Sequence, residues 1–413
     1  MGVSGSLVRP EPTMDRVAEL EFWTGFALFR DPWVAAPSST QARDGLGPLF
    51  SARSCIACHE HGGRGDSLIA DTETASTVFR LVEDPQLNAR FGRQIQHRAI
   101  YDVNETGRGF GGFFQGEPRP TIEIEEVSLA IPGNWTLKRI HARLPNAPEY
   151  AVSPRVAPSL FGLGLLEAIP DARLVALSDP DDRNNDGISG RVNWVGTGDK
   201  LRAGRFGWKA PHATVAEQTA DAFRHDIGIT NRFQPSQDCA ALQLGCQQQT
   251  SGDGPQGPHE INGILFDATV NFTASIAVPD ARTLTEAVRR GQRLFNDTGC
   301  ASCHTPAHSI RVDGETQTIW PYTDLLLHDM GPLLADAVVE GVAHGSEWRT
   351  PPLWGLGLAQ HFNRDTGLLH DGRAATVAEA VLWHGGEAAE SARQFLALDR
   401  DEQHALEAFV HAL

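Results

Sequence analysis

The sequence has no run of apolar residues that could span a membrane, because a transmembrane helix needs about 18 or more of them in a row. It is also poor in basic residues, since 35 Lys and Arg face 52 Asp and Glu, giving a net charge of -17. Nucleic acids and anionic lipids attract basic surfaces. We therefore exclude both as partners and expect small molecules, cations or proteins with a basic face.

Cysteine is scarce as well, with six among 413 residues, too few for a scaffold held together by disulfides. No apolar segment follows the first four residues, so we expect the chain as given to be a mature or trimmed form without its secretory signal. The length predicts two or three domains.

Four of the six cysteines lie in two copies of the pattern C-x-x-C-H, at Cys55, Cys58 and His59 and at Cys300, Cys303 and His304. This pattern is typical of a c-type haem attachment site, in which two thiols form thioethers and the histidine ligates the iron. Zinc would need further ligands nearby, and a redox C-x-x-C motif would not need the histidine twice. We therefore predict two covalently bound c-type haems.

The remaining pair, Cys239 and Cys246, is predicted to form a disulfide, because c-type haem is attached outside the cytoplasm, where disulfides persist. A redox-active disulfide is the alternative, although no His, Lys or Arg flanks the pair to lower a thiol pKa.

The chain repeats itself beyond the haem motifs. Segment 158–165 matches 351–358, with Arg155 and Arg349 shortly before each, and segment 213–217 matches 375–379. A Leu-Phe pair also precedes each haem motif, at 49–50 and 294–295. Matches in the same order predict two related lobes. We expect an N-terminal helical extension at 1–44, a first haem lobe with insertions at 45–275 and a second haem lobe at 276–413.

Apolar spacing and capping residues predict helices at 15–29, 283–295, 376–384 and 399–413. Alternation at 122–125 predicts one short strand. The expected fold is mainly α, with two cytochrome c-like haem lobes, long loops and minor β.

Several further strings carry a resemblance to a known family: 153–170, 181–190, 204–210, 321–332, 347–357, 369–374 and 383–386. Their order resembles the bacterial di-haem cytochrome c peroxidase and MauG superfamily. The strings themselves resemble its di-haem oxidoreductase branch, whose members are also called thiol oxidoreductases. The resemblance covers roughly residues 45–413.

The resemblance implies a ligand for the second haem. In the peroxidases, the segment resembling 370–372 is followed fourteen residues later by the distal ligand, which is Met there and Tyr in the MauG type. Here that position holds His384, so we expect ligation by His304 and His384. Met330 is the rival ligand, and a histidine without a ligand role is the other alternative.

At the first haem the repeat places Ala222 where the second lobe has His384, and alanine cannot ligate iron. We therefore expect an open iron at His59, where peroxide, dioxygen or a substrate would bind. In the peroxidases a nearby Glu moves protons, and the corresponding segment here offers Glu217 beside Ala216. Glu167 is the preferred candidate because its neighbours are apolar. A role in capping, or in an ion pair with Arg155, is the alternative for Glu167.

Three further residues are candidates for roles near the haems. Trp208 is predicted to relay electrons or carry a radical, with an ordinary core position as the alternative. Arg155 and Arg349 are predicted to bind haem propionates, with surface ion pairs as the alternative.

Segment 182–188 resembles the first half of a calcium loop, with Asp182, Asn184, Asp186 and the carbonyl of Ile188 as candidate ligands. Asn193 stands where such a loop has its bidentate Glu. An Asn/Asp/Gly-rich turn that bonds its own backbone is the alternative.

These features together predict a periplasmic di-haem oxidoreductase that resembles the peroxidases. Its expected partner is a small redox protein with a basic face, or a small-molecule oxidant. The alternatives are a di-haem cytochrome that only transfers electrons, and a protein-modifying oxidase or oxygenase of the MauG type.

Overall fold

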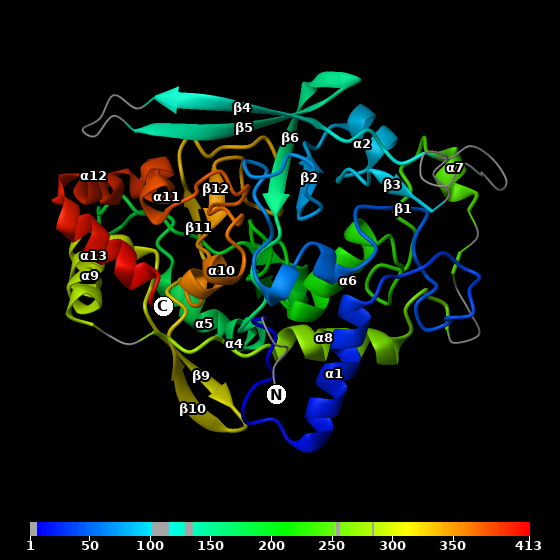
Figure 1. Ribbon diagram of the computed structural model, residues 1–413, viewed down its shortest axis with the longest axis horizontal. Coiled ribbons are helices and arrows are strands. Elements are labelled where there is room, and N and C mark those ends of the chain that lie inside the picture. Colours follow the sequence, from blue (N-terminus) through cyan, green and yellow to red (C-terminus); the bar gives the residue numbers. More distant parts are fainter. Residues whose placement is uncertain (1–5, 101–114, 129–134, 250, 253–256, 283–284) are drawn as a thin grey trace.

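The structure is a computed structural model that describes residues 6–100, 115–128, 135–249, 251–252, 257–282 and 285–413 (Figure 1). The first four residues, which lack the apolar segment of a secretory signal, lie outside this range, and so do the first two residues of the helix expected at 283–295. Among the described residues, no helix combines the length and apolar character needed to cross a bilayer.

The α-helices of the described residues are α1 (Arg16–Arg30), α2 (Pro85–Phe91), α4 (Leu163–Glu167), α5 (Asp171–Leu177), α6 (Val215–Asp226), α7 (Leu244–Gln247), α8 (Gly263–Ala274), α9 (Glu286–Asp297), α10 (Leu356–Phe362), α11 (Val377–Trp383), α12 (Ala389–Ala397) and α13 (Arg400–Val410). The helices predicted at 15–29, 376–384 and 399–413 are confirmed as α1, α11 and α13. Each begins after an Asp or Thr whose side chain accepts backbone N–H bonds.

The strands form one larger sheet and four pairs. Strands β2 (Thr77–Leu81), β6 (Ala147–Val156), β5 (Thr136–Leu144) and β4 (Thr121–Ser128) make an antiparallel sheet in that order. The pairs are β1 (Leu49–Phe50) with β3 (Arg98–Ala99), β7 (Trp194–Val195) with β8 (Arg202–Ala203), β9 (His308–Val312) with β10 (Glu315–Ile319), and β11 (Leu327–Asp329) with β12 (Glu347–Arg349).

This mixture of helices and strands corrects the expectation of a mainly α fold. The predicted strand at 122–125 is confirmed, but it is part of the longer β4, which pairs with β5 over its whole length. Alternate side chains in the second half of β5 are buried, namely Ile140, Ala142 and Leu144, because one face of the sheet covers an apolar cluster. The partner strands β2 and β6 lie far apart in the sequence, so local patterns gave no sign of their pairing.

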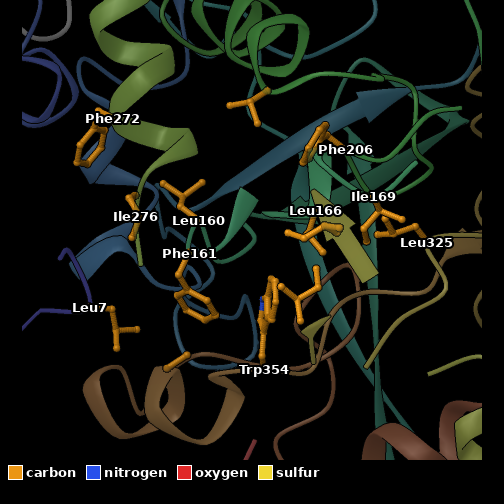
Figure 2. Packing of buried hydrophobic residues seen from close by; sticks show 14 of the residues in the cluster. Leu7, Leu160, Phe161, Leu166, Ile169, Phe206, Phe272, Ile276, Leu325 and Trp354 are labelled. Atoms are coloured by element: carbon orange, nitrogen blue, oxygen red, sulfur yellow. The ribbon is translucent and has the colours of Figure 1, made fainter. Parts of the chain in front are cut away.

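The two copies of the 158–165 pattern pack against each other near the centre of the molecule. Gly162 and Gly355 both have a left-handed backbone and begin α4 and α10. A side chain at Gly162 would collide with Trp354, and one at Gly355 would collide with Phe161. Figure 2 shows Phe161 and Trp354 in this cluster with Leu160 and Ile276. The repeated segments therefore make reciprocal contacts that need glycine on both sides.

The repeats are not identical in structure. The Leu-Phe pair before the first haem motif lies in β1, whereas the pair before the second motif lies in α9. Helix α9 packs along α13 at one end of the molecule, while α1 packs along α8 (Figure 1).

The α9–α13 contact yields a stability prediction. A methyl group at Gly291 of α9 would meet the backbone carbonyl of Ala405 in α13. We expect Gly291→Ala to lower the free energy of unfolding by about 1–3 kcal/mol, because overpacking outweighs the helix propensity of alanine. Denaturant unfolding measures the change.

The matched control is Gly263→Ala in α8, where the nearest atom is the end of the Arg232 side chain at 3.8 Å. It should not destabilise the protein, so equal stability of the two variants would contradict the prediction.

Candidate functional site

One cavity brings together both predicted haem motifs. Among the described residues, its wall includes the side chains Cys55, Cys58, His59, Cys300, Cys303, His304 and His384. Apolar side chains from three separate core clusters complete the wall, for example Phe161, Phe223 and Val410. Segments far apart in the sequence thus enclose a single, largely buried space.

The first motif forms a short 3₁₀ turn over Cys55–Ala57. The Nδ1 atom of His59 donates a hydrogen bond to the carbonyl of Pro158 at 2.8 Å, which leaves Nε2 without its proton. Burial lowers the pKa of His59 to about 4, so the imidazole is neutral at pH 7. Burial also raises the pKa of the Cys55 thiol to about 12.

The second motif repeats this geometry over Cys300–Ser302. His304 donates from Nδ1 to the carbonyl of Tyr322 at 3.0 Å, and burial lowers its pKa to about 4. His384 follows α11 directly and donates from Nδ1 to the carbonyl of Ala380 at 2.6 Å. Burial lowers the pKa of His384 too, and its proximity contributes to the lowered pKa of His304.

These observations fit covalently bound haem. Three neutral, half-buried imidazoles have Nδ1 bonded to a backbone carbonyl, the arrangement that orients a histidine whose Nε2 binds a metal. The four cysteines of the motifs are not in disulfides, and the wall around them is apolar.

The cavity also contains the other residues expected at the distal sides. Ala222 of α6 lies in its wall, as does Met330, the rival ligand of the second haem. Helices α6 and α11 begin alike, with a Thr side chain that accepts from the backbone of a Glu three residues later. The equivalent positions eight residues after each Thr therefore hold Ala222 and His384.

The two candidate catalytic acids, Glu167 and Glu217, lie outside the cavity wall. The carboxylate of Glu167 accepts the backbone N–H of Val215 at 2.9 Å. The carboxylate of Glu217 accepts from Ala213 and Thr214 and pairs with Arg202. Neither residue is part of the described cavity wall. Both carboxylates accept backbone N–H groups at the start of α6. Glu167 therefore has the capping geometry considered as its alternative. This geometry favours an acid–base role for neither residue.

Trp208 lies in the cavity wall, and its indole N–H donates to the carbonyl of Val156 at 2.9 Å. The guanidinium of Arg64 lies 5.0 Å from the centre of its ring. Arg64 is a cavity residue that sequence reasoning missed. It donates to the carbonyls of Gly367 and Leu369, and no described carboxylate pairs with it. Arg64 follows His59 by only five residues, and this closeness to the first motif is the feature of the sequence that could have identified it.

Arg155 and Arg349, the two arginines expected to bind haem propionates, differ in whether a carboxylate pairs with them. Arg155 is buried and pairs with Asp336 at 2.8 Å, so its charge is already compensated. Arg349 donates to the carbonyls of Gly207 and Thr350, and no described carboxylate lies within hydrogen-bonding distance. Burial lowers the pKa of Arg349 to about 10. Both arginines are buried, so neither forms the surface ion pair considered as an alternative.

The expected calcium loop is an exposed turn that bonds its own backbone. Asp182 accepts from the N–H of Asp186 at 3.0 Å, Asn184 accepts from the same N–H, and Asp186 accepts from Ile188. This is the geometry of the alternative considered for this segment, although Asp186 remains exposed and Asp182 is only half-buried.

A second polar cluster lies beside Cys303. His328 is buried between two carboxylates, with Nε2 2.9 Å from Asp324 and Nδ1 2.7 Å from Glu387. Burial alone would lower the pKa of His328, but the two carboxylates raise it well above its usual range. Glu387 also accepts from Ser189, which ties the segment after the 182–188 turn to the second motif. Sequence reasoning did not single out this cluster.

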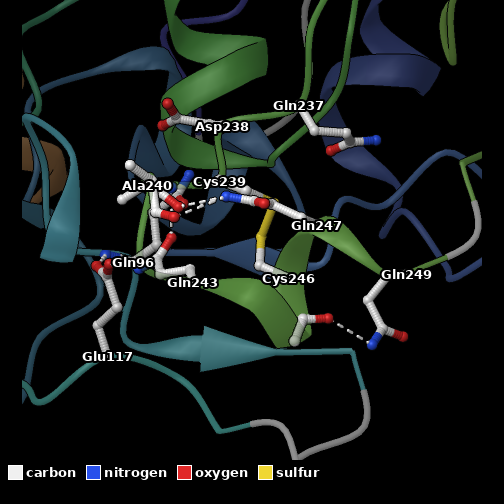
Figure 3. The surroundings of a disulfide bond; sticks show 12 residues. Gln96, Glu117, Gln237, Asp238, Cys239, Ala240, Gln243, Cys246, Gln247 and Gln249 are labelled. Atoms are coloured by element: carbon white, nitrogen blue, oxygen red, sulfur yellow. Dashed lines mark hydrogen bonds between the residues drawn. A yellow bond between two sulfur atoms is a disulfide. The ribbon is translucent and has the colours of Figure 1, made fainter. Parts of the chain in front are cut away.

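Cys239 and Cys246 are joined by a disulfide, with Cα atoms 5.6 Å apart (Figure 3). Cys246 is buried against Leu49 and Ala99, near the first motif's strand pair. This shielding favours a structural role over the redox-active alternative.

The capping geometry of Glu217 yields a prediction. We expect Glu217→Ala to lower the free energy of unfolding by about 1 kcal/mol, because two backbone N–H groups at the start of α6 lose their acceptor. Glu390→Ala, at an exposed site on α12, is the control and should change stability by less than about 0.5 kcal/mol. Equal stability of both variants in thermal unfolding would contradict the capping role.

Comparison with known proteins places the chain in a family. The family model described as "Di-haem oxidoreductase, putative peroxidase" matches residues 139–413. No curated protein matches the chain. A solved structure of hydrazine synthase from Kuenenia stuttgartiensis, pressurised with xenon, aligns over 100% of this chain and 98% of that chain, with 14% identity and a TM-score of 0.37.

The family match spans about two thirds of the 413 residues and includes the second haem motif, His384 and both repeated segments. The chain therefore belongs to the di-haem oxidoreductase family.

Proposed function

We propose that this protein is a periplasmic di-haem c-type oxidoreductase that reacts with peroxide at an open haem on His59 and transfers electrons through a haem ligated by His304 and His384. The observation that carries the proposal is the asymmetry between two equivalent helix positions. Ala222 and His384 both line the cavity, but only His384 can ligate iron.

Haem iron, when bound, exchanges single electrons and binds small ligands at an open coordination position. The chain's residues set the conditions. The hydrogen bonds from Nδ1 of His59 and His304 to backbone carbonyls leave Nε2 of each ring available to bind iron. His384, directly after α11, is held by the same kind of hydrogen bond. Cys55 with Cys58, and Cys300 with Cys303, would form the thioethers.

The cavity offers cations for the haem propionates. Arg349 and Arg64 are the better candidates, because neither has a described carboxylate partner, whereas Arg155 is paired with Asp336. Trp208 lines the same cavity and is the candidate to relay electrons between the two haems. The nearby charge of Arg64 disfavours a cation radical on its ring, which weighs against the MauG-type alternative.

The proposal also includes a division of the chain into domains and a location outside the cytoplasm. We assign a helical extension to 1–44, a first cytochrome c-like lobe to 45–275 and a second to 276–413. The disulfide and the haem attachment motifs support a location outside the cytoplasm. The net charge of -17 supports a redox partner with a basic face. The 182–188 turn, with the carboxylates of Asp182 and Asp186, is the candidate site for Ca²⁺.

Optical and EPR spectra of the oxidised protein test the proposal. We expect one high-spin and one low-spin haem, with added peroxide changing only the high-spin signals, since an open iron is needed for the reaction. Two low-spin haems that do not react with peroxide would instead support the electron-transfer cytochrome.

Substitution of His384 tests the ligand assignment. We expect His384→Ala to convert the low-spin signal to high spin, because one of two imidazole ligands is removed. His361→Ala, on the exposed surface of α10, is the control and should leave the spectrum unchanged.

If His384→Ala keeps the low-spin signal and Met330→Ala loses it, the ligand is Met330, which also lines the cavity.

A further inference from the structure

His212 lies in the cavity wall beside the helix that borders the first haem motif. A tight loop holds it there: the N–H groups of Arg205 and Phe206 donate to the His212 carbonyl at 2.7 and 3.0 Å. Gly207 and Ala210 within this loop both have positive φ, at 81° and 53°. The loop therefore fixes the position of His212, even though its backbone is unfavourable at Ala210.

Helix α6 connects this loop to the first motif. The carbonyl of Asp226, at the end of α6, accepts from Ser51 and Ala52, which lead into the motif. The charge of Asp226 also contributes to the raised pKa of the Cys55 thiol, after the larger effect of burial. One turn earlier, Asp221 and Ala222 face the cavity with His212. His212 therefore lies on the side of the cavity that belongs to the first motif.

Asp221 connects His212 to a cation. One oxygen of its carboxylate is 3.5 Å from Nε2 of His212 and 2.8 Å from the guanidinium of Arg80. Its other oxygen is 2.9 Å from Nδ1 of His225. Burial alone would raise the pKa of Asp221, but His225 and Arg80 hold it well below its usual range. Asp221 is thus a carboxylate that is already engaged by cations, and it is a poor acceptor for another proton.

His212, unlike Asp221, has a nitrogen atom that no cation or hydrogen-bond donor engages in the described part of the chain. Asp221 contacts one ring nitrogen, and Nδ1 has no hydrogen-bond partner among the described residues. The side chain is 18% exposed, and His212 is one of the residues that line the cavity. An imidazole is the side chain that exchanges protons most readily near neutral pH. The carboxylates of Glu167 and Glu217 accept backbone N–H groups at the start of α6, so neither is placed to accept a proton from a ligand in the cavity.

We propose that His212 accepts the proton of a weakly acidic ligand, such as hydrogen peroxide or hydrogen cyanide, that enters the cavity at the first haem. The proposal rests on the open haem site proposed above. With hydrogen peroxide, an O–H bond breaks, its electron pair stays on oxygen, and the proton passes to the imidazole. With hydrogen cyanide, the H–C bond breaks and its electron pair stays on carbon. No electron leaves the ligand in this step, so no oxidant or reductant is required.

Cyanide binding to the oxidised protein carrying both haems tests the proposal without relying on turnover. We expect His212→Gln and His212→Asn each to slow cyanide binding by about 100-fold or more, the usual effect of losing a general base. Carbon monoxide binding to the reduced protein is the internal control. It involves no proton, so its rate should change by less than about twofold, which also shows that the cavity has kept its shape. His141→Gln, on β5 outside the cavity, is the matched control for both rates.

The possible failures can be told apart. If both His212 variants bind cyanide at the rate of the unmodified protein, His212 is not the proton acceptor, while the open haem stands. If His212→Gln converts a low-spin first haem to high spin, His212 is an iron ligand and the proposal is wrong. If the unmodified protein has two low-spin haems and binds no cyanide, the proposed function itself fails.

Discussion

The hydrogen bond from a half-buried imidazole to a backbone carbonyl is the contact on which the rest of the site depends. His59, His304 and His384 each make it through Nδ1, and each stays neutral because burial lowers its pKa. The carbonyl is local only for His384. For His59 it comes from Pro158, 99 residues away, so the proline-rich segment must be in place before the ring is oriented. Ligand geometry and tertiary packing are therefore inseparable here.

Enclosing a cavity between distant segments leaves buried charges that must be compensated. Arg155 and Lys209 both lie over the ring of Trp348, and both pair with Asp336. His370 stacks on the same ring at 3.7 Å. Removing one member of such a group would leave a buried charge without a partner, which costs far more than the intact group contributes. The wall is thus held rigid by polar contacts as well as by apolar packing.

Different residues at equivalent positions of the repeated segments account for the asymmetry of the site. The same Pro-rich pattern places Gly162 against Trp354 and Gly355 against Phe161, so each copy needs the other for its packing. The same Thr–Glu cap begins α6 and α11. Among the differences within this shared frame, Ala222 against His384 separates a position that cannot ligate from one that can. The surroundings differ too, since the first site has His212, Asp221 and Arg80 in its wall.

Residues adjacent in the sequence were predictable. The C-x-x-C-H motifs, the Cys239–Cys246 disulfide and helices α1, α11 and α13 depend on short spacings and local caps, which a single sequence displays. The pairing of β2 with β6, Arg64 against Trp208, the pairing of Arg155 with Asp336 and the cap made by Glu167 join partners 48 or more residues apart. Apolar neighbours made Glu167 look like a catalytic acid, but the nearby start of α6 supplied a backbone donor for its carboxylate. The sequence by itself determined the two C-x-x-C-H motifs on which the proposed haem sites rest, because a motif of this kind depends only on local spacing. Only the tertiary structure decided which charged side chains face the cavity, because burial and pairing arise when distant segments pack together.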